Sequence, residues 1–221
     1  MNKTHNYKKN VSEFIKFNRM IENENLNPMT SGNSSIRIAG NLTMIKPTGM
    51  RFDKINENDL SVIDIHGNLI KGKHPSSDFP LHLTLYKLIN NINCIVHTHS
   101  HYATVFSIVG KDIEPLSTLH ADFFGENIPC LSFANHRTKS IIYTIQNNID
   151  KIKKAGAFLI GNHGAFIVGE DMERTFKMAI ALEESAMLNY HALLVSKQIK
   201  KIPKLDIKVM HNYYLTKYGQ R

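Results

Sequence analysis

The chain has little cysteine and no long apolar run, and each shortage excludes a class of protein. Its 221 residues include only two cysteines, Cys94 and Cys130, which lie far apart inside apolar stretches. Two such residues support neither a disulfide framework nor a cysteine zinc site, and they suit a reducing cytoplasm. No apolar run approaches the roughly 20 residues of a membrane-spanning helix. Because the start MNKTHNYKKN also lacks the apolar core of a signal peptide, we expect a cytoplasmic protein without a membrane partner.

The chain carries an excess of positive charge, with 27 Lys and Arg against 19 Asp and Glu and a formal net charge of +8. These cations are scattered through both ends of the chain and form no stripe with interleaved aromatic residues. We therefore expect no nucleic-acid partner. A basic chain is also compatible with an anionic small substrate such as a phosphate ester, since positive potential concentrates anions near a site.

The length and the hydrophobic content of 42% are sufficient for one well-buried domain, which we expect to span residues 1–221. Helical spacing of apolar residues predicts helices over residues 8–24, 78–91 and about 170–197, and a last one that includes Leu205 and Tyr213. Short apolar segments predict strands over residues 36–38, 42–45, 60–65, 93–97 and 157–161. Strands and helices without regular alternation indicate a layered α/β domain whose sheet need not be parallel.

The strongest chemical signal is a pair of histidines, His97 and His99, at the end of an apolar segment. In an extended chain residues i and i+2 point to the same side, so both imidazoles are expected to face one pocket. A third histidine, His163, follows the apolar segment 157–161 and is flanked by glycines that permit close approach of backbone and ligands. Three neutral imidazoles leave one coordination position open, which is typical of a catalytic zinc site.

The three histidines also have a simpler interpretation without a metal, and the chain contains two further candidate ligands. His97 and His99 could be hydrogen-bonded core residues or loop residues without a metal. His101 would share the face of the pair only if the strand continued, and His120 lies in a separate segment. We leave His101 and His120 outside the predicted ligand set.

Three short clusters of hydroxyl and glycine residues are candidates for an anion site: Ser31-Gly32-Asn33-Ser34, Lys46-Pro47-Thr48-Gly49 and Pro75-Ser76-Ser77. Backbone amides in turns, hydroxyl groups and the positive end of a helix all bind anions such as phosphate. Each cluster alone could be an ordinary turn or helix cap. Their joint presence carries weight only beside the metal site.

Two acidic residues are candidates for proton transfer. Asp78 directly follows the serine cluster, and Asp122 lies in the segment HADFFG. A carboxylate close to a metal-bound substrate can move a proton on the carbon or hydroxyl group that the metal acidifies. Taken singly, Asp78 could be a helix-start charge and Asp122 a turn residue.

Taken together, these motifs resemble the class II aldolase and adducin-domain family, which contains L-fuculose-1-phosphate aldolase and L-ribulose-5-phosphate 4-epimerase. The resemblance runs from about residue 8 to the C-terminus. It rests on the segments SGNSSIR, IKPTGM, GKHPSSDFPLHLTLY, IVHTHSHYAT, HADFFGENIPC, NHGAFIVG and ALEESA.

The resemblance implies a role for each matched residue. His97, His99 and His163 match the zinc ligands of the family, and Asp78 matches its acid/base residue. The positions that hold the substrate phosphate in the family are matched by Gly32, Asn33, Thr48, Gly49, Ser76 and Ser77. In the family, zinc stabilises the enediolate that forms when a carbon–carbon bond breaks. Imidazole ligands also bind manganese, iron or cobalt, so a divalent metal other than zinc is an alternative.

Some residues of the chain resemble the aldolases of the family, and others resemble the epimerase. Asp122 matches a second acid/base residue of the epimerase, whereas the short segment between Cys130 and Ala157 is aldolase-like. Tyr218 lies near the position of the aldolase's C-terminal tyrosine, a candidate proton donor, while Tyr213 and Thr216 replace His and Arg positions of the epimerase. The resemblance therefore implies a zinc-dependent sugar-phosphate aldolase, with a pentulose-phosphate 4-epimerase as the alternative. A related dehydratase or decarboxylase, or a non-enzymatic adducin-like interaction module, is a weaker option.

The resemblance also implies a fold and an assembly. Members of the family have a single layered α/β domain with a central, largely antiparallel sheet flanked by helices. They are commonly homotetramers whose active sites lie at subunit interfaces. In such an assembly Asp122 or Tyr218 would serve the zinc site of a neighbouring subunit.

Overall fold

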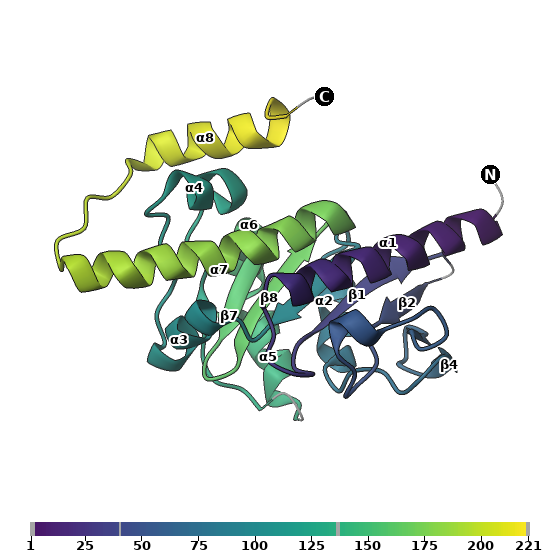
Figure 1. Ribbon diagram of the computed structural model, residues 1–221. Helices are drawn as coiled ribbons and strands as arrows, with labels where there is room; N and C mark the ends of the chain where they lie inside the picture. The colour runs from purple at the N-terminus through teal and green to yellow at the C-terminus, as the bar shows by residue number, and fades with distance from the viewer. Residues whose placement is uncertain (1–2, 40, 136–137, 220–221) are drawn as a thin grey trace.

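The computed structural model describes residues 3–39, 41–135 and 138–219. These residues form one β-sheet with helices packed on it (Figure 1). Within these ranges the sheet has eight strands in the order β4-β3-β2-β1-β5-β8-β7-β6. The strands are β1 (Asn33–Ile38), β2 (Leu42–Ile45), β3 (Ser61–Ile63), β4 (Leu69–Lys71), β5 (Cys94–Thr98), β6 (Cys130–Leu131), β7 (Ala157–Ile160) and β8 (Gly164–Gly169). All neighbours pair antiparallel except β6 and β7, which are parallel. The expected α/β fold with a largely antiparallel sheet is confirmed.

Helices cover both faces of this sheet. They are α1 (Lys3–Asn23), α2 (Phe79–Leu88), α3 (His101–Val109), α4 (Thr118–Phe124), α5 (Ser140–Asn147), α6 (Ile149–Ala155), α7 (Met172–Val195) and α8 (Lys204–Thr216), with a short 3-10 helix η1 (Phe52–Lys54). In Figure 1, α1 and α7 run along one side of the sheet, where Phe17 and Phe176 stack at 5.3 Å between ring centroids. No helix in the described ranges is long and apolar enough to cross a membrane.

The central strands are buried on both faces, which explains why they read as continuous apolar segments. In β7, Ala157 and Leu159 belong to the core shared with α1 and α7, whereas Phe158 and Ile160 belong to the core under α2, α5 and α6. This alternation follows from the period of two in a strand. The sheet is therefore the middle of three layers.

The predicted elements are all present, with shifted boundaries. The helix predicted over residues 8–24 begins five residues earlier, at Lys3. The strand predicted over residues 60–65 ends at Ile63, because the Asp64 carboxylate accepts hydrogen bonds from the backbone N–H groups of His66 and Asn68 and forms a turn. The sequence did not predict β4, β6 or β8, nor helices α3 to α6.

The C-terminal helix α8 packs on α4 rather than on the sheet. Figure 1 shows α8 above α4, after a connection that leaves the end of α7. The His211 ring on α8 donates from Nδ1 to the backbone oxygen of Asp122 on α4 at 2.7 Å. This pairing determines where both Asp122 and Tyr218 lie.

Candidate metal centre and anion loops

Three histidines meet at one end of the sheet. His97 lies in β5, His99 follows it, and His163 lies in the turn between β7 and β8. Their ring centroids are 4.6 Å (His97 to His99), 4.7 Å (His97 to His163) and 5.1 Å (His99 to His163) apart. One nitrogen from each ring lies within 4.8 Å of the others. The structure thus brings together the three residues that the sequence singled out.

Strand β8 orients the His97 ring. The Nδ1 atom of His97 donates to the Ala165 backbone oxygen at 2.9 Å, and the ring stacks on Phe166 with 3.9 Å between centroids. Because Nδ1 carries the proton, Nε2 is left as the ligand atom, 2.9 Å from Nε2 of His99. Burial, with smaller contributions from His163 and His99, holds the pKa of His97 well below its ordinary value. His97 is therefore neutral, as a metal ligand must be.

The donor set fits a tetrahedral divalent ion. Nitrogen ligands lie about 2.0–2.1 Å from zinc, so two of them are roughly 3.3 Å apart at a tetrahedral angle. The 2.9 Å between the Nε2 atoms of His97 and His99 is close to this value. Three imidazoles leave a fourth position for a substrate or water oxygen. The same set suits other divalent transition metals.

Asp78 lies beside this cluster. Its Oδ2 accepts a hydrogen bond from Nδ2 of Asn33 at 2.7 Å and is 3.9 Å from Nε2 of His97. Although Asp78 is the N-cap residue of α2, its side chain makes no cap hydrogen bond. Its Oδ1 is buried and has no hydrogen-bond partner among the described residues. The Asp78 side chain therefore does not cap the helix by a hydrogen bond, and its carboxylate lies next to the histidine cluster.

Backbone hydrogen bonds bring the three candidate anion clusters together. The Lys46 N–H donates to the Ser34 oxygen at 3.0 Å, and the Ser76 N–H donates to the Lys46 oxygen at 3.0 Å. Pro47 and Pro75 form an isolated antiparallel bridge. The three loops therefore form one surface next to Asp78.

The predicted phosphate residues differ in exposure. Asn33 and Ser76 are buried, Gly32 is half-buried, and Thr48, Gly49 and Ser77 are exposed. Gly32 has φ +69° and Gly49 has φ +68°, backbone conformations that favour glycine. The surface thus offers backbone amides and hydroxyl groups at its rim and two buried polar side chains at its base.

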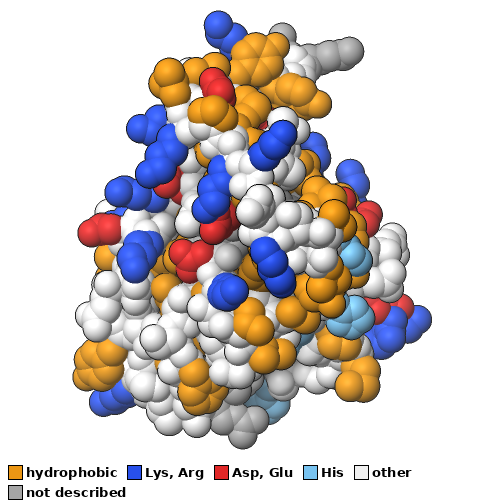
Figure 2. All heavy atoms as spheres, turned by 90° about the vertical axis from the view of Figure 1, so that its left-hand side faces the viewer, with side chains coloured by type: hydrophobic (Ala, Val, Ile, Leu, Met, Phe, Trp, Pro, Cys, Tyr) orange, Lys and Arg blue, Asp and Glu red, His pale blue; other side chains and the backbone are white. Residues whose placement is uncertain are grey.

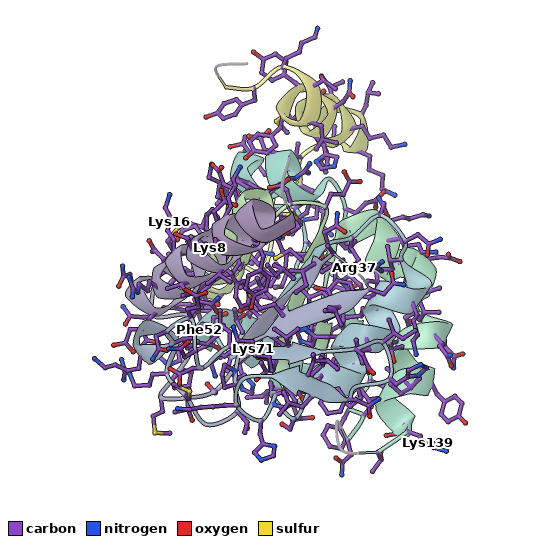
Figure 3. The ribbon with its side chains drawn as sticks, turned by 90° about the vertical axis from the view of Figure 1, so that its right-hand side faces the viewer. Lys8, Lys16, Arg37, Phe52, Lys71 and Lys139 are labelled. Atoms are coloured by element: carbon purple, nitrogen blue, oxygen red, sulfur yellow. The ribbon has the colours of Figure 1, made fainter. Side chains whose placement is uncertain are left out.

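A buried lysine that the sequence analysis did not assign lies under these loops. Lys46 is 1% exposed, its Nζ donates to the Thr30 oxygen at 3.2 Å, and the ammonium group lies 4.9 Å from the Phe52 ring centroid. Figure 3 labels Phe52 on the side of the molecule formed by β1 to β4. Burial lowers the pKa of Lys46 to about 8, although Glu22 and Asp78 act in the opposite direction. Its position in the cluster KPTG was the available signal.

We expect Lys46→Met to raise the free energy of unfolding of the metal-free protein by up to about 3 kcal/mol at pH 7. The unfolded lysine holds its proton up to its ordinary pKa of 10.5, whereas the folded one loses it near 8, so folding is penalised below pH 8. The penalty fades as the pH rises from 8 to 10.5. Urea unfolding of the wild type and of Lys46→Met at pH 7 and 9.5 measures the difference in their free energies of unfolding. A difference that is the same at both pH values would contradict the prediction.

Asp122 and Tyr218 belong to other elements than the three histidines. Asp122 is inside α4, where burial raises the pKa of its carboxyl group, and so it is not a turn residue. Tyr218 follows α8, is 60% exposed and stacks on Tyr214 at 5.0 Å between ring centroids. Tyr214 in turn contacts Phe123 at 4.7 Å. Both candidates therefore belong to the α4 and α8 pair, and not to the end of β5.

The two spare histidines do not join the cluster. His101 is the exposed first residue of α3. His120 is buried in α4, and its Nε2 lies 2.9 Å from the Glu126 backbone oxygen. The ligand set stays at three residues in the described part of the chain.

A separate cavity of about 660 Å³ lies between the start of β6 and α8. Its lining residues include none of the three histidines and not Asp78, so it is distinct from the histidine site. Figure 2 faces the side with the α7 to α8 connection and shows basic and acidic side chains interspersed there. All five lysines that line the cavity are exposed. It lacks the buried polar groups of the histidine site.

Comparison with known proteins agrees with this fold. The family model of the Class II Aldolase and Adducin N-terminal domain matches residues 12–190. An L-fuculose 1-phosphate aldolase structure is 26% identical, with a TM-score of 0.84 over 92% of this chain and 95% of that chain. YgbL from Klebsiella pneumoniae, described as a putative aldolase/epimerase/decarboxylase, is 22% identical, with a TM-score of 0.83 over 95% of this chain and 99% of that chain. An L-fuculose-1-phosphate aldolase from Thermus thermophilus is 22% identical, with a TM-score of 0.73 over 86% and 97% of the two chains.

Proposed function

Since the chain belongs to the class II aldolase and adducin N-terminal domain family, we propose that it is a zinc-dependent sugar-phosphate aldolase. Its reaction would be retro-aldol cleavage of a small phosphorylated ketose. One observation carries the proposal: the buried Asp78 carboxylate lies 3.9 Å from Nε2 of His97, between the histidine cluster and the anion loops. Acid/base group, metal ligands and phosphate donors are thus adjacent, as cleavage of a sugar phosphate requires.

The anion loops would orient the substrate. Its phosphate would accept hydrogen bonds from Asn33, Ser76 and Ser77 and from the backbone around Gly32, Thr48 and Gly49. The Lys46 ammonium group beneath the loops supplies a compensating charge. With the phosphate held there, the carbon chain of the substrate would extend past Asp78 toward His97. Positioning of this kind removes much of the entropic barrier of the reaction.

A divalent ion bound by His97, His99 and His163 would supply Lewis acidity to the carbonyl and hydroxyl oxygens of the substrate. Bond cleavage requires one proton to leave a substrate hydroxyl group as the aldehyde forms, and one proton to reach the carbon that retains the electron pair. Asp78 would exchange the proton at that carbon through Oδ1, the buried oxygen without a hydrogen-bond partner in the described ranges. Asn33 holds the other carboxylate oxygen and so orients the group.

We assign the second acid/base role to Asp122 or Tyr218 of a neighbouring subunit in a homotetramer. Within one chain both residues lie at the α4 and α8 pair, which contains none of the three histidines, so we expect them to reach a histidine cluster across an interface. One inactive variant carries His97→Ala, and the other carries Asp122→Asn and Tyr218→Phe. Mixed in equal amounts and co-assembled at random in a symmetric tetramer, they should recover about a quarter of wild-type activity. Absence of recovery, or a fully active monomer, would contradict the shared site.

The alternative is 4-epimerisation of a pentulose phosphate such as L-ribulose 5-phosphate. Asp122 in HADFFG favours it, because an epimerase needs an acid/base residue on each side of the substrate. Both reactions share the cleavage step, and they differ in whether the aldehyde fragment leaves. Their products therefore separate them.

The decisive experiment combines metal analysis with turnover. Elemental analysis of the purified protein is followed by NMR of a panel of phosphorylated ketoses, with His97→Ala as the control. About one zinc per chain and metal-dependent release of an aldehyde and a small phosphorylated fragment are expected. Isomer exchange without release would favour the epimerase, and neither metal nor turnover would favour an adducin-like interaction module. We place the protein in the cytoplasm, where its two free cysteines would stay reduced.

A further inference from the structure

Asn27 lies between the first anion loop and the metal ligand His99. Its side chain is 7% exposed, and its Oδ1 accepts a hydrogen bond from the backbone N–H of His99 at 2.7 Å. The two residues are 72 positions apart in the chain, so this contact exists only in the folded protein. The N–H of His99 needs an acceptor, which defines Oδ1 as the atom that faces it.

The loop that follows Asn27 closes directly over its amide group. A Cβ atom at Gly32 would lie 2.2 Å from Oδ1 and 2.6 Å from Nδ2 of Asn27. Such distances are far inside van der Waals contact, so only glycine permits this approach. The φ of +69° at Gly32 gives a second reason for glycine here. The position of the loop and the position of the Asn27 amide are thus mutually dependent.

The other side of the His99 peptide is held by a long-range helix cap. Helix α3 begins two residues later, and Ser100 at its N-cap makes no side-chain cap hydrogen bond. Instead Glu183 on α7 accepts from the N–H groups of Tyr102 at 2.8 Å and Ala103 at 3.0 Å. The helix after His99 is therefore anchored to α7, and Asn27 is the contact that ties His99 itself to the anion loop.

We propose that Asn27 is a positioning residue that couples the Gly32 loop to the metal ligand His99. This inference rests on the proposed metal site. Metal affinity depends on the direction of the His99 ring, which the backbone at His99 determines. Partners that orient metal ligands typically contribute 10- to 100-fold to affinity. A disturbance of the loop at Gly32 would reach the metal through Asn27.

Zinc affinity of the full chain, measured by competition with a chromophoric chelator, tests this coupling. Asn27→Ala is expected to weaken zinc binding by about 10- to 100-fold. Asn27→Asp keeps the acceptor for the His99 N–H and is expected to bind zinc at least as tightly as the wild type. Asn91→Ala is the matched control, because Asn91 donates to Glu170 in an exposed bond that does not involve the site. Loss of affinity in Asn27→Asp equal to that in Asn27→Ala would overturn the proposal.

A double-mutant cycle with Gly32 tests the transmission. Gly32→Ala places a methyl group against the Asn27 amide and is expected to weaken zinc binding about as much as Asn27→Ala does. In the Asn27→Ala background the same change meets no amide, so it should add less than about threefold. If the fold-loss of zinc affinity in the double variant equals the product of the losses in the two single variants, coupling through Asn27 is contradicted.

Two further readouts separate this inference from its premise and from a structural role. Zinc affinities are compared at a temperature where thermal melting shows every variant folded without metal. If Asn27→Ala lowers the melting temperature but leaves the zinc dissociation constant unchanged, Asn27 is only structural and the inference fails. If the wild type itself binds no zinc or other divalent metal, the proposed function fails instead.

Discussion

Replacing His97 with alanine is expected to remove most of the bound metal and to lower turnover by roughly 10³-fold or more, since a Lewis-acidic ion contributes several kcal/mol. His97 is fully buried, and its Nε2 is near both His99 and Asp78. Two histidines without the third leave a weak site. Metal content by elemental analysis and product release by NMR measure the two effects.

The matched control for this substitution is His101→Ala. His101 is four residues away, exposed and outside the histidine cluster, so its removal should change neither metal content nor turnover. His97→Ala also removes the ring that stacks on Phe166, which would destabilise the metal-free protein by about 2–4 kcal/mol through the cavity left behind. Assays must therefore be made well below the melting temperature. Full metal content in folded His97→Ala protein would refute the ligand assignment.

Replacing Asp78 with asparagine is expected to lower kcat by about 10²- to 10⁴-fold while metal content stays at the wild-type level. The amide has the shape of the carboxylate and can still accept the hydrogen bond from Asn33 through its oxygen. It cannot take up a proton at the substrate carbon. The measurement is steady-state kinetics on the substrate identified by NMR, together with exchange of the substrate C–H proton in D₂O.

The control for Asp78→Asn is Asp150→Asn, an exposed carboxylate in the first turn of α6. It removes the same charge from a site that is not involved in the reaction. If Asp78→Asn raised KM but left kcat and proton exchange intact, Asp78 would bind the substrate without moving a proton. Loss of metal in the same variant would show that Asp78 acts on the histidine cluster instead.

Part of the site followed from local patterns. The spacing of His97 and His99 predicts a shared direction because a strand has a period of two, and the flanking glycines of His163 indicate a close approach. The hydroxyl clusters beside Asp78 were visible in the same way. These patterns did not predict β8. This strand pairs with β5, and its residues Ala165 and Phe166 orient the His97 ring.

Other features depend on contacts between residues far apart in the chain. Lys46 lies in a loop motif, but its burial under Thr30 and against Phe52 becomes visible only when the loops are assembled. The bond from His99 to Asn27 likewise has no local signature. Asp122 and Tyr218 were predicted to act in the site, and the packing of α8 on α4 places both at a pair of helices that contains none of the three histidines.

The sequence by itself determined the α/β class, the antiparallel character of the sheet through its family resemblance, and the identity of the three histidines. The α/β class and the three histidines could be predicted because residue spacing along a strand or helix directly sets which side chains share a face. The tertiary structure alone decided the strand order, the orientation of the His97 ring and the coupling of the Gly32 loop to His99. Those features depend on contacts between segments that are far apart in the chain. The pattern of a single segment does not specify which distant segment it contacts.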